Sequence, residues 1–217
     1  GGAMIQHPVD LYYYAGGRQN GSLFVPAQGT AATCELGGDG PIFFVRRSLS
    51  RAIFEAGGDN APLNLCKFPA MNGFAQHLKD MGAEGLIGLQ QGEIPASIYK
   101  FFNEKLSPFG ECPDITTIVH RQREVKSAWE IEMLEAGAKI QLKMFDAVTA
   151  TGGEGVTELE LVAAAEAVSR AEGFGGSVQM RRFPMQCDRG VIIAGRAGGI
   201  PSFFDSALGG IGAHPLS

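Results

Sequence analysis

The stretch His120–Ile140, HRQREVKSAWEIEMLEAGAKI, decides how the chain divides. Basic residues crowd its start, and Ser127 stands three residues before Glu130. This spacing is typical of a capping box, in which the hydroxyl accepts a backbone N–H at the helix start and the carboxylate reaches back to the cap. We therefore predict that a long helix begins after Ser127, and that a basic hinge between two domains precedes it.

Apolar residues recur every three or four positions after this cap, which predicts one apolar face on the helix. They are Ile131, Leu134, Ala138, Leu142 and Phe145. The segment Thr151-Gly152-Gly153 ends the pattern, because glycine disfavours a helix interior.

A second helix is predicted to start at another capping box, formed by Thr157 and Glu160, and to end at Gly173. Glycine-punctuated, strand-like runs follow from Gly175 to Ser217. A helix pair followed by such runs predicts that residues 120–217 are the first part of an α+β domain.

The first third of the chain carries short apolar or aromatic runs separated by His-Pro, Gly-Gly and Gly-Asp-Gly breaks. Such breaks are turn chemistry, so the runs predict short strands and an antiparallel start to a sheet. The runs are Ala3–Ile5, Leu11–Tyr14, Ser22–Val25 and Ile42–Val45.

Helix and strand signals alternate in the next part of the chain. The expected helices are 48–56, 72–81 and 95–106, and the expected strands are 85–88 and 114–119. Strands followed by such alternation predict an α/β domain with a mixed sheet flanked by helices, which we place at residues 1–119.

Composition excludes several classes of protein. The chain has 217 residues, 18 Lys+Arg and 23 Asp+Glu, so its formal charge of -5 leaves no broad basic surface for nucleic acid. Its apolar runs are far shorter than the roughly 20 residues of a membrane span. The start does not resemble a signal peptide, and Gly1–Met4 is either native or a cloning remnant. We expect a cytoplasmic protein.

Residue types that carry chemistry form no complete catalytic set. The four cysteines lie 32, 46 and 75 residues apart, so no C-x-x-C pair exists and the thiols are expected to be idle. The histidines are interpreted as a turn residue (His7), two solvent-facing residues (His77 and His120) and a loop residue (His214). No activated nucleophile, phosphate loop or metal site is predicted.

Three segments in order, HRQREVKSAWEIEMLEAGAKI, GVTELEL and SRAEGFGG, resemble the start of the catalytic domain of the creatinase, prolidase and Xaa-Pro aminopeptidase superfamily. Arg123–Ser127 matches its Arg-x-x-Lys-Ser segment, and Gly155–Glu158 matches its Gly-x-Thr-Glu turn. Upstream, DLYYYAGGRQNGSLFVPAQG and FFVRRSLSRA resemble its N-terminal domain. The resemblance runs over nearly the whole chain.

The resemblance implies a ribonuclease H-like N-terminal domain followed by a partial pita-bread domain. It also implies two divalent metals, manganese or cobalt, held by two Asp, a His and two Glu, with a bridging hydroxide that attacks the scissile carbonyl. These ligands are expected downstream of the segment that ends near Pro215. We therefore expect no cofactor in this chain.

Two departures from the family pattern bear on activity. The family's substrate-binding histidine is expected after Gly190–Ala194, where this chain reads GRAGGIPSFFD, with no histidine before Asp205. Loss of that donor would weaken stabilisation of the tetrahedral intermediate. The family's opening helix is expected to be shortened or absent.

The functional expectation is an Xaa-Pro aminopeptidase- or dipeptidase-like metallohydrolase acting on a peptide or small molecule, with this chain alone inactive. A non-catalytic module for dimerisation or interaction and a creatinase-type C–N hydrolase remain alternatives.

A homodimer is expected from the resemblance. Tyr13, Arg18 and Gln19 would border the substrate pocket or the dimer edge, unless the tyrosines pack in the sheet's own core. Pro201, Ser202 and His214 are further pocket-edge candidates.

Overall fold

The computed structural model describes residues 1–27, 31–32, 38–176, 192–195 and 199. The chain divides into two compact units, Gly1–Val125 and Lys126–Ser217. This boundary lies C-terminal to the division after residue 119 that we expected. Whether residues 1–119 and 120–217 are the two family domains stays a prediction. None of the described helices combines the length and apolar character that a membrane crossing requires.

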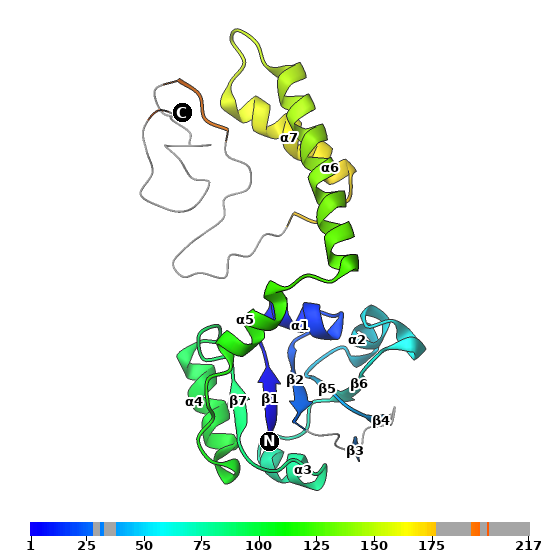
Figure 1. Cartoon of the computed structure of the whole chain (residues 1–217), viewed down its shortest axis with the longest axis vertical. Coiled ribbons are helices and arrows are strands. Elements are labelled where there is room, and N and C mark those ends of the chain that lie inside the picture. The colour runs from blue at the N-terminus through cyan, green and yellow to red at the C-terminus, as the bar shows by residue number, and fades with distance from the viewer. Residues whose placement is uncertain (28–30, 33–37, 177–191, 196–198, 200–217) are drawn as a thin grey trace. The chain divides into compact units, whose positions relative to one another are not determined.

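A five-stranded mixed sheet forms the first unit, in the order β6-β5-β2-β1-β7 (Figure 1). β1 pairs with β2 and β2 with β5 in antiparallel fashion, which confirms the expected antiparallel start. The β1–β7 and β5–β6 pairs are parallel. The strands are β1 (Gly2–Ile5), β2 (Gly21–Pro26), β5 (Ile42–Val45), β6 (Asn64–Lys67) and β7 (Ile87–Leu89), and a separate pair joins β3 (Ala31–Ala32) to β4 (Gly38–Asp39).

Five helices and two short 3-10 turns accompany this sheet. The helices are α1 (Pro8–Ala15), α2 (Leu49–Glu55), α3 (Phe74–Asp80), α4 (Ala96–Lys105) and α5 (Thr116–Glu124), and the turns are η1 (Gly58–Asn60) and η2 (Ser107–Phe109).

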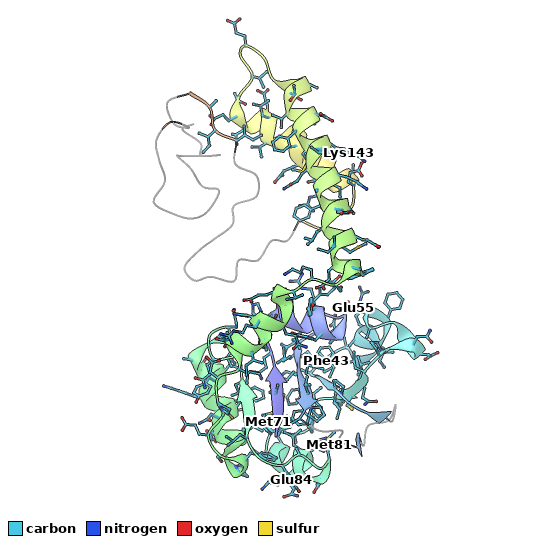
Figure 2. The ribbon with its side chains drawn as sticks, in the orientation of Figure 1. Phe43, Glu55, Met71, Met81, Glu84 and Lys143 are labelled. Carbon is cyan, nitrogen blue, oxygen red and sulfur yellow. The ribbon has the colours of Figure 1, made fainter. Side chains whose placement is uncertain are left out.

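Both faces of the sheet are buried, because successive strand residues point to opposite sides. Met4 and Phe24 pack with α3 and α4 on one face. Their neighbours Ile5 and Leu23 pack with α1 and α2 on the other face. Phe43, labelled in Figure 2, belongs to this second core and is fully buried.

Close approach at Gly88 brings the start of α5 against the sheet. A Cβ built on Gly88 would collide with the side chain of Ile115, the residue before α5. Glycine therefore allows Ile115 to lie on the backbone of β7.

Two predicted strands are wrong. Leu11–Tyr14 lies in α1, which begins at Pro8 and closes at Gly16 with φ 69°. Leu11 and Ala15 are buried four residues apart, the spacing of a helix face. The predicted strand 114–119 pairs only at Asp114, whose carboxylate accepts the N–H of Thr116, the first residue of α5.

The described part of the second unit contains α6 (Ala128–Thr151) and α7 (Glu158–Ala171). Both capping boxes are present, which confirms the predicted helix starts. The Glu130 N–H donates to Ser127 Oγ at 3.3 Å, and the Ser127 N–H donates to Glu130 Oε2 at 2.7 Å. The two helices pack against each other, and Lys143 of α6, labelled in Figure 2, pairs with Glu172 at 2.5 Å.

Candidate functional site

Parallel strands β1 and β7 end at the same edge of the sheet, and polar residues follow both. The carboxyl ends of parallel strands are where ligand groups gather in α/β sheets. Gln90, directly after β7, is 1% exposed, and its Oε1 accepts the backbone N–H groups of Gln6 at 2.9 Å and His7 at 3.2 Å. Gln90 therefore ties the two strand ends together through their backbone.

Asp10, in the first turn of α1, is fully buried beside these strand ends. Its carboxylate accepts from Arg123 Nη1 at 2.5 Å and from Gln90 Nε2 at 2.7 Å, and it lies 3.2 Å from His7 Nδ1. Burial alone would raise its pKa, but the hydrogen bonds of His7, Gln90 and Arg123 outweigh burial and lower the pKa to about 2. Asp10 is therefore held as a buried, paired carboxylate.

Glu93 is a second buried carboxylate, and it lies between two histidines. Its Oε1 is 2.8 Å from His120 Nε2, and its Oε2 is 3.8 Å from His7 Nε2. The ring of His7 therefore has a carboxylate on each side, Asp10 and Glu93. His120 was expected to face solvent, but its side chain is only 20% exposed because α5 turns it inward.

We name the six residues His7, Asp10, Gln90, Glu93, His120 and Arg123 the strand-end cluster. Its members come from both strand ends, from α1 and from α5, so it joins elements that are distant in the chain. Arg123, interpreted from the sequence as part of a solvated linker face, pairs with Asp10 and lies over the Tyr13 ring, 4.8 Å from its centroid.

The strand-end cluster consists mainly of paired charged and polar groups. It contains carboxylates, imidazoles, a guanidinium and an amide, but no hydroxyl or thiol nucleophile. Its groups bond mainly to one another. The arrangement can therefore hold α5 on the sheet, since Asp10 and Glu93 pair with Arg123 and His120 of that helix.

The predicted site residues separate into two places. Tyr13 lies on α1 against Arg123 and makes an edge contact with Tyr14 at 4.8 Å between centroids. Arg18 and Gln19 instead hold Glu55 of α2, labelled in Figure 2: the Arg18 N–H donates to Oε2 at 3.4 Å, and Gln19 Nε2 lies 3.2 Å from each carboxylate oxygen. Pro201, Ser202 and His214 lie outside the described residues.

Glu55 also accepts from Arg51 Nε at 2.7 Å. Hydrogen bonds from Arg51 and Gln19 lower its pKa. The segment after α1 is thereby attached to α2 by a single carboxylate.

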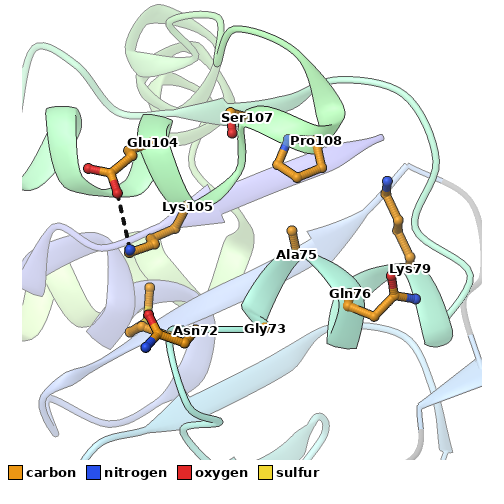
Figure 3. A pocket seen from close by; sticks show the side chains of 10 residues that line it. Asn72, Gly73, Ala75, Gln76, Lys79, Glu104, Lys105, Ser107 and Pro108 are labelled. Atoms are coloured by element: carbon orange, nitrogen blue, oxygen red, sulfur yellow. Dashed lines mark hydrogen bonds and ion pairs between the residues drawn. The ribbon is translucent and has the colours of Figure 1, made fainter.

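Among the described residues of the first unit, two of the cavities have the size of a small ligand. One of about 390 Å³ is mostly apolar and opens between β1, β2 and α5, with Ile118 and Gln122 among its lining residues. Tyr14 also lines it, and burial raises the Tyr14 pKa. The other, of about 310 Å³, lies between α3 and α4 (Figure 3). Its Lys105 pairs with Glu104, and its Lys79 lies over the Phe109 ring, so neither cavity concentrates charge.

No group of three or more His, Cys, Asp or Glu in the described residues is arranged to hold a metal ion. Cys112 is buried, and burial, with the Glu111 charge, raises its pKa to about 11. This thiol is therefore protonated at neutral pH. The residues described here do not fit the two-metal centre that the resemblance implies.

Sequence reasoning missed the strand-end cluster, although two signals were present. Polar residues stand close after two predicted strands: Gln6-His7 directly follows 3–5, and Gln90-Gln91 follows 85–88 after one residue. His7 and Asp10 also have the i, i+3 spacing that brings side chains together on a helix. The partners His120 and Arg123 carry no local signal of this kind.

The fold is similar to solved structures of proline-directed peptidases. One is an Xaa-Pro dipeptidase from Bacillus anthracis, with 19% identity and TM-score 0.63 over 79% of this chain and 44% of that chain. An X-Pro aminopeptidase from Thermotoga maritima MSB8 has 16% identity and TM-score 0.63 over 79% and 47%. A prolidase from Pyrococcus furiosus has 22% identity and TM-score 0.58 over 79% and 45%.

The chain spans less than half the length of these three proteins. No family model matches it, and no curated protein does. The resemblance inferred from the sequence is confirmed at the level of fold, including the mixed sheet of the α/β domain.

Proposed function

We propose that the chain forms the N-terminal domain and the first catalytic-domain helices of an Xaa-Pro dipeptidase- or aminopeptidase-like metallohydrolase. The observation that carries this is the extent of the structural match. Coverage of 79% of 217 residues is about 171 residues, more than the 125 residues of the first unit. The match therefore reaches into the second unit, and it is not confined to one common α/β fold.

The substrate class in this proposal is a peptide with proline in second position. Two divalent metals, Mn²⁺ or Co²⁺, would supply Lewis-acid catalysis and an activated water. Since the described residues offer no ligand cluster, we assign none of them to the metals. In this proposal the strand-end cluster holds α5 on the sheet of the first unit. α5 is the last helix before the linker to α6.

A non-catalytic homologue is the second candidate, and one sequence observation favours it. The segment GRAGGIPSFFD lacks the histidine that the family pattern places there. In this case the fold would serve dimerisation or interaction. A creatinase-type C–N hydrolase is the third candidate, because it shares the fold and differs in substrate.

Hydrolysis assays on the natural full-length protein separate these candidates. After loading with Mn²⁺ or Co²⁺, the protein would be offered an Xaa-Pro dipeptide, an Xaa-Pro-Yaa tripeptide, the matching Xaa-Ala peptides and creatine. We expect cleavage of the proline peptides only. Cleavage of creatine alone supports the third candidate, and metal binding with no hydrolysis supports the second.

We also propose a cytoplasmic homodimer with Tyr13, Arg18 and Gln19 at the contact or pocket edge. Tyr12 and Tyr13 of α1 are exposed, which supports an accessible aromatic surface there. Sedimentation equilibrium at micromolar concentration would report the mass. A monomer mass contradicts the dimer, and a dimer that survives Tyr13→Ala with Arg18→Ala places the contact elsewhere.

A further inference from the structure

The second face of the sheet is covered unevenly along β1 and β2. Ile5 and Leu23, which face each other across the two strands, are 4% and 1% exposed. The next facing pair on the same side, Ala3 and Val25, is only half-buried. The length of the covering helices explains this difference. α1 and α2 have eight and seven residues and are about 12 Å and 10 Å long, whereas the six residues of β2 extend over about 20 Å.

The apolar cavity of about 390 Å³ lies over this part of the sheet, and we name it the sheet cavity. Its lining includes both facing pairs on the sheet, Tyr14 of α1 and Gln122 of α5. Sites for small molecules typically have volumes of roughly 300–1,000 Å³ and mostly apolar walls with a few polar groups. The sheet cavity therefore has the size and the composition of a small-molecule site.

The described residues that line the sheet cavity include no charged side chain. Most of them are aliphatic, and two are prolines, Pro41 and Pro62, which have no backbone N–H to donate. An ionised group placed in such surroundings loses its hydration without gaining a partner, and this costs far more free energy than burying a neutral group. The lining therefore favours an uncharged molecule.

The Tyr14 hydroxyl is a polar group of this lining that lacks a partner. Its oxygen is buried and makes no hydrogen bond to any residue that the structure describes. Burial, together with the charge of Asp10, raises the Tyr14 pKa, so the hydroxyl keeps its proton at neutral pH and can both donate and accept. Buried polar groups in folded proteins nearly always have a hydrogen-bond partner. A molecule in the sheet cavity can supply one.

We propose that the sheet cavity binds an uncharged, mostly apolar molecule through one hydrogen bond to the Tyr14 hydroxyl. The apolar part of the ligand lies on the aliphatic floor that β1 and β2 provide, and the exposed Gln122 of α5 stands at the rim. This inference uses neither the metals nor the peptide substrate of the proposed hydrolase, so it holds or fails independently of them.

Titration of the full chain with three probes, followed by NMR of isotope-labelled methyl groups, tests this proposal. All three probes have a naphthalene ring: 2-naphthol carries a hydroxyl, 2-methylnaphthalene carries a methyl group in its place, and 2-naphthoate carries a charge. With the first two probes at neutral pH, we expect saturable shifts at Leu23 and Ile118 and none at Met71 and Ala75, which line the other cavity. 2-Naphthoate should bind at least about tenfold more weakly than 2-naphthol, because its charge must leave water.

Tyr14→Phe tests the hydrogen bond, because it removes the hydroxyl and keeps the ring. The affinity for 2-naphthol relative to that for 2-methylnaphthalene should fall about fivefold, which is the effect of losing one hydrogen bond. Comparing both probes in both proteins cancels any general change in apolar contact. An unchanged ratio of affinities would overturn the proposal.

Gln122→Trp tests the place of binding, because it adds a large side chain at the rim of the sheet cavity. The matched control is Gln76→Trp beside the other cavity, where Gln76 is labelled in Figure 3, and both glutamines are exposed. Gln122→Trp should weaken the binding of 2-naphthol by at least about fivefold, whereas Gln76→Trp should leave it within about twofold.

Three further results would overturn the proposal: no saturable shift with either uncharged probe, equal shifts in the two cavities, or equal loss of binding in the two tryptophan variants. None of these measurements involves hydrolysis. A protein without peptidase activity can therefore pass this test, and an active peptidase can fail it.

Discussion

The sheet unit and the α6–α7 pair bury their apolar residues to very different extents. In the first unit, each central strand places large side chains on both faces and helices cover both. In the second, α7 has buried residues but α6 has none. A sheet covered on both faces completes its core within its own residues, whereas the described helix pair leaves most of α6 exposed. Burial thus distinguishes the covered sheet of the first unit from the exposed helix α6.

The largest expected effect is at the centre of the sheet. Phe44 is fully buried and contacts the rings of Phe68 and Phe74 at 5.7 Å between centroids. Phe44→Ala should lower the free energy of unfolding of the first unit by about 3–5 kcal/mol, because it removes a buried ring and leaves a cavity. Urea denaturation, with hydrogen exchange resolved by peptide, measures the loss.

Phe54→Ala is the matched control, because Phe54 is 73% exposed in the same unit. It should change stability by less than about 0.5 kcal/mol. If Phe44→Ala also sped exchange in α6 to the same degree as in the sheet, the two units would unfold as one and the contrast between them would not hold.

The next effect is the pH dependence of the strand-end cluster. The pKa of Asp10 falls from 3.8 to about 2 on folding, so its contribution is complete above pH 3.8 and is lost as pH falls through about 2. The shift corresponds to about 2 kcal/mol of stability for the first unit at neutral pH. Urea midpoints measured from pH 5 to pH 2 should therefore fall less steeply in Asp10→Asn than in the parent protein.

Asp80→Asn serves as the control for this titration, since Asp80 is an exposed carboxylate on α3. The urea midpoint of Asp80→Asn should fall between pH 5 and pH 2 as steeply as that of the parent protein. If the urea midpoint of Asp10→Asn fell as steeply as that of the parent protein, the Asp10 carboxylate would not contribute this stability.

A smaller effect is expected at the start of α6. Ser127→Ala removes the side-chain acceptor of the Glu130 N–H and should destabilise the helix by about 1 kcal/mol. Faster hydrogen exchange in the first turns of α6 would report it. Ser127→Asp keeps an acceptor at the cap and should restore slow exchange; equal exchange in both variants would contradict a role for the cap.

The smallest expected effect is a gain in the stability of α6. Gly137 lies within α6, and a Cβ added there meets no atom within 4 Å. Gly137→Ala should therefore stabilise the helix by roughly 0.8–1 kcal/mol through a reduced loss of backbone entropy. A loss of stability would instead show that something covers this position, which thermal unfolding followed by circular dichroism would reveal.

Local chemistry explains what could be predicted from the sequence. Both capping boxes use groups three residues apart, so the starts of α6 and α7 follow from neighbouring side chains. Glycine and proline breaks likewise placed β1, β2 and β5, because these breaks act within a single turn. The run Leu11–Tyr14 was wrongly predicted to be a strand because its three aromatic residues favour one. Pro8 at its start and Gly16 at its end instead delimit a helix.

The strand-end cluster and the burial of α6 could not be predicted in this way. Gln90 reaches Asp10 across 80 positions, and Arg123 reaches it across 113, so no local pattern records these pairs. The apolar spacing of α6 predicted a face at Ile131, Leu134, Ala138, Leu142 and Phe145, but spacing does not say which face meets α7. Short-range hydrogen bonds and turns depend on residues that are close in the sequence, so the sequence alone determines them. Burial and charge pairing depend on which distant segments the tertiary structure brings together.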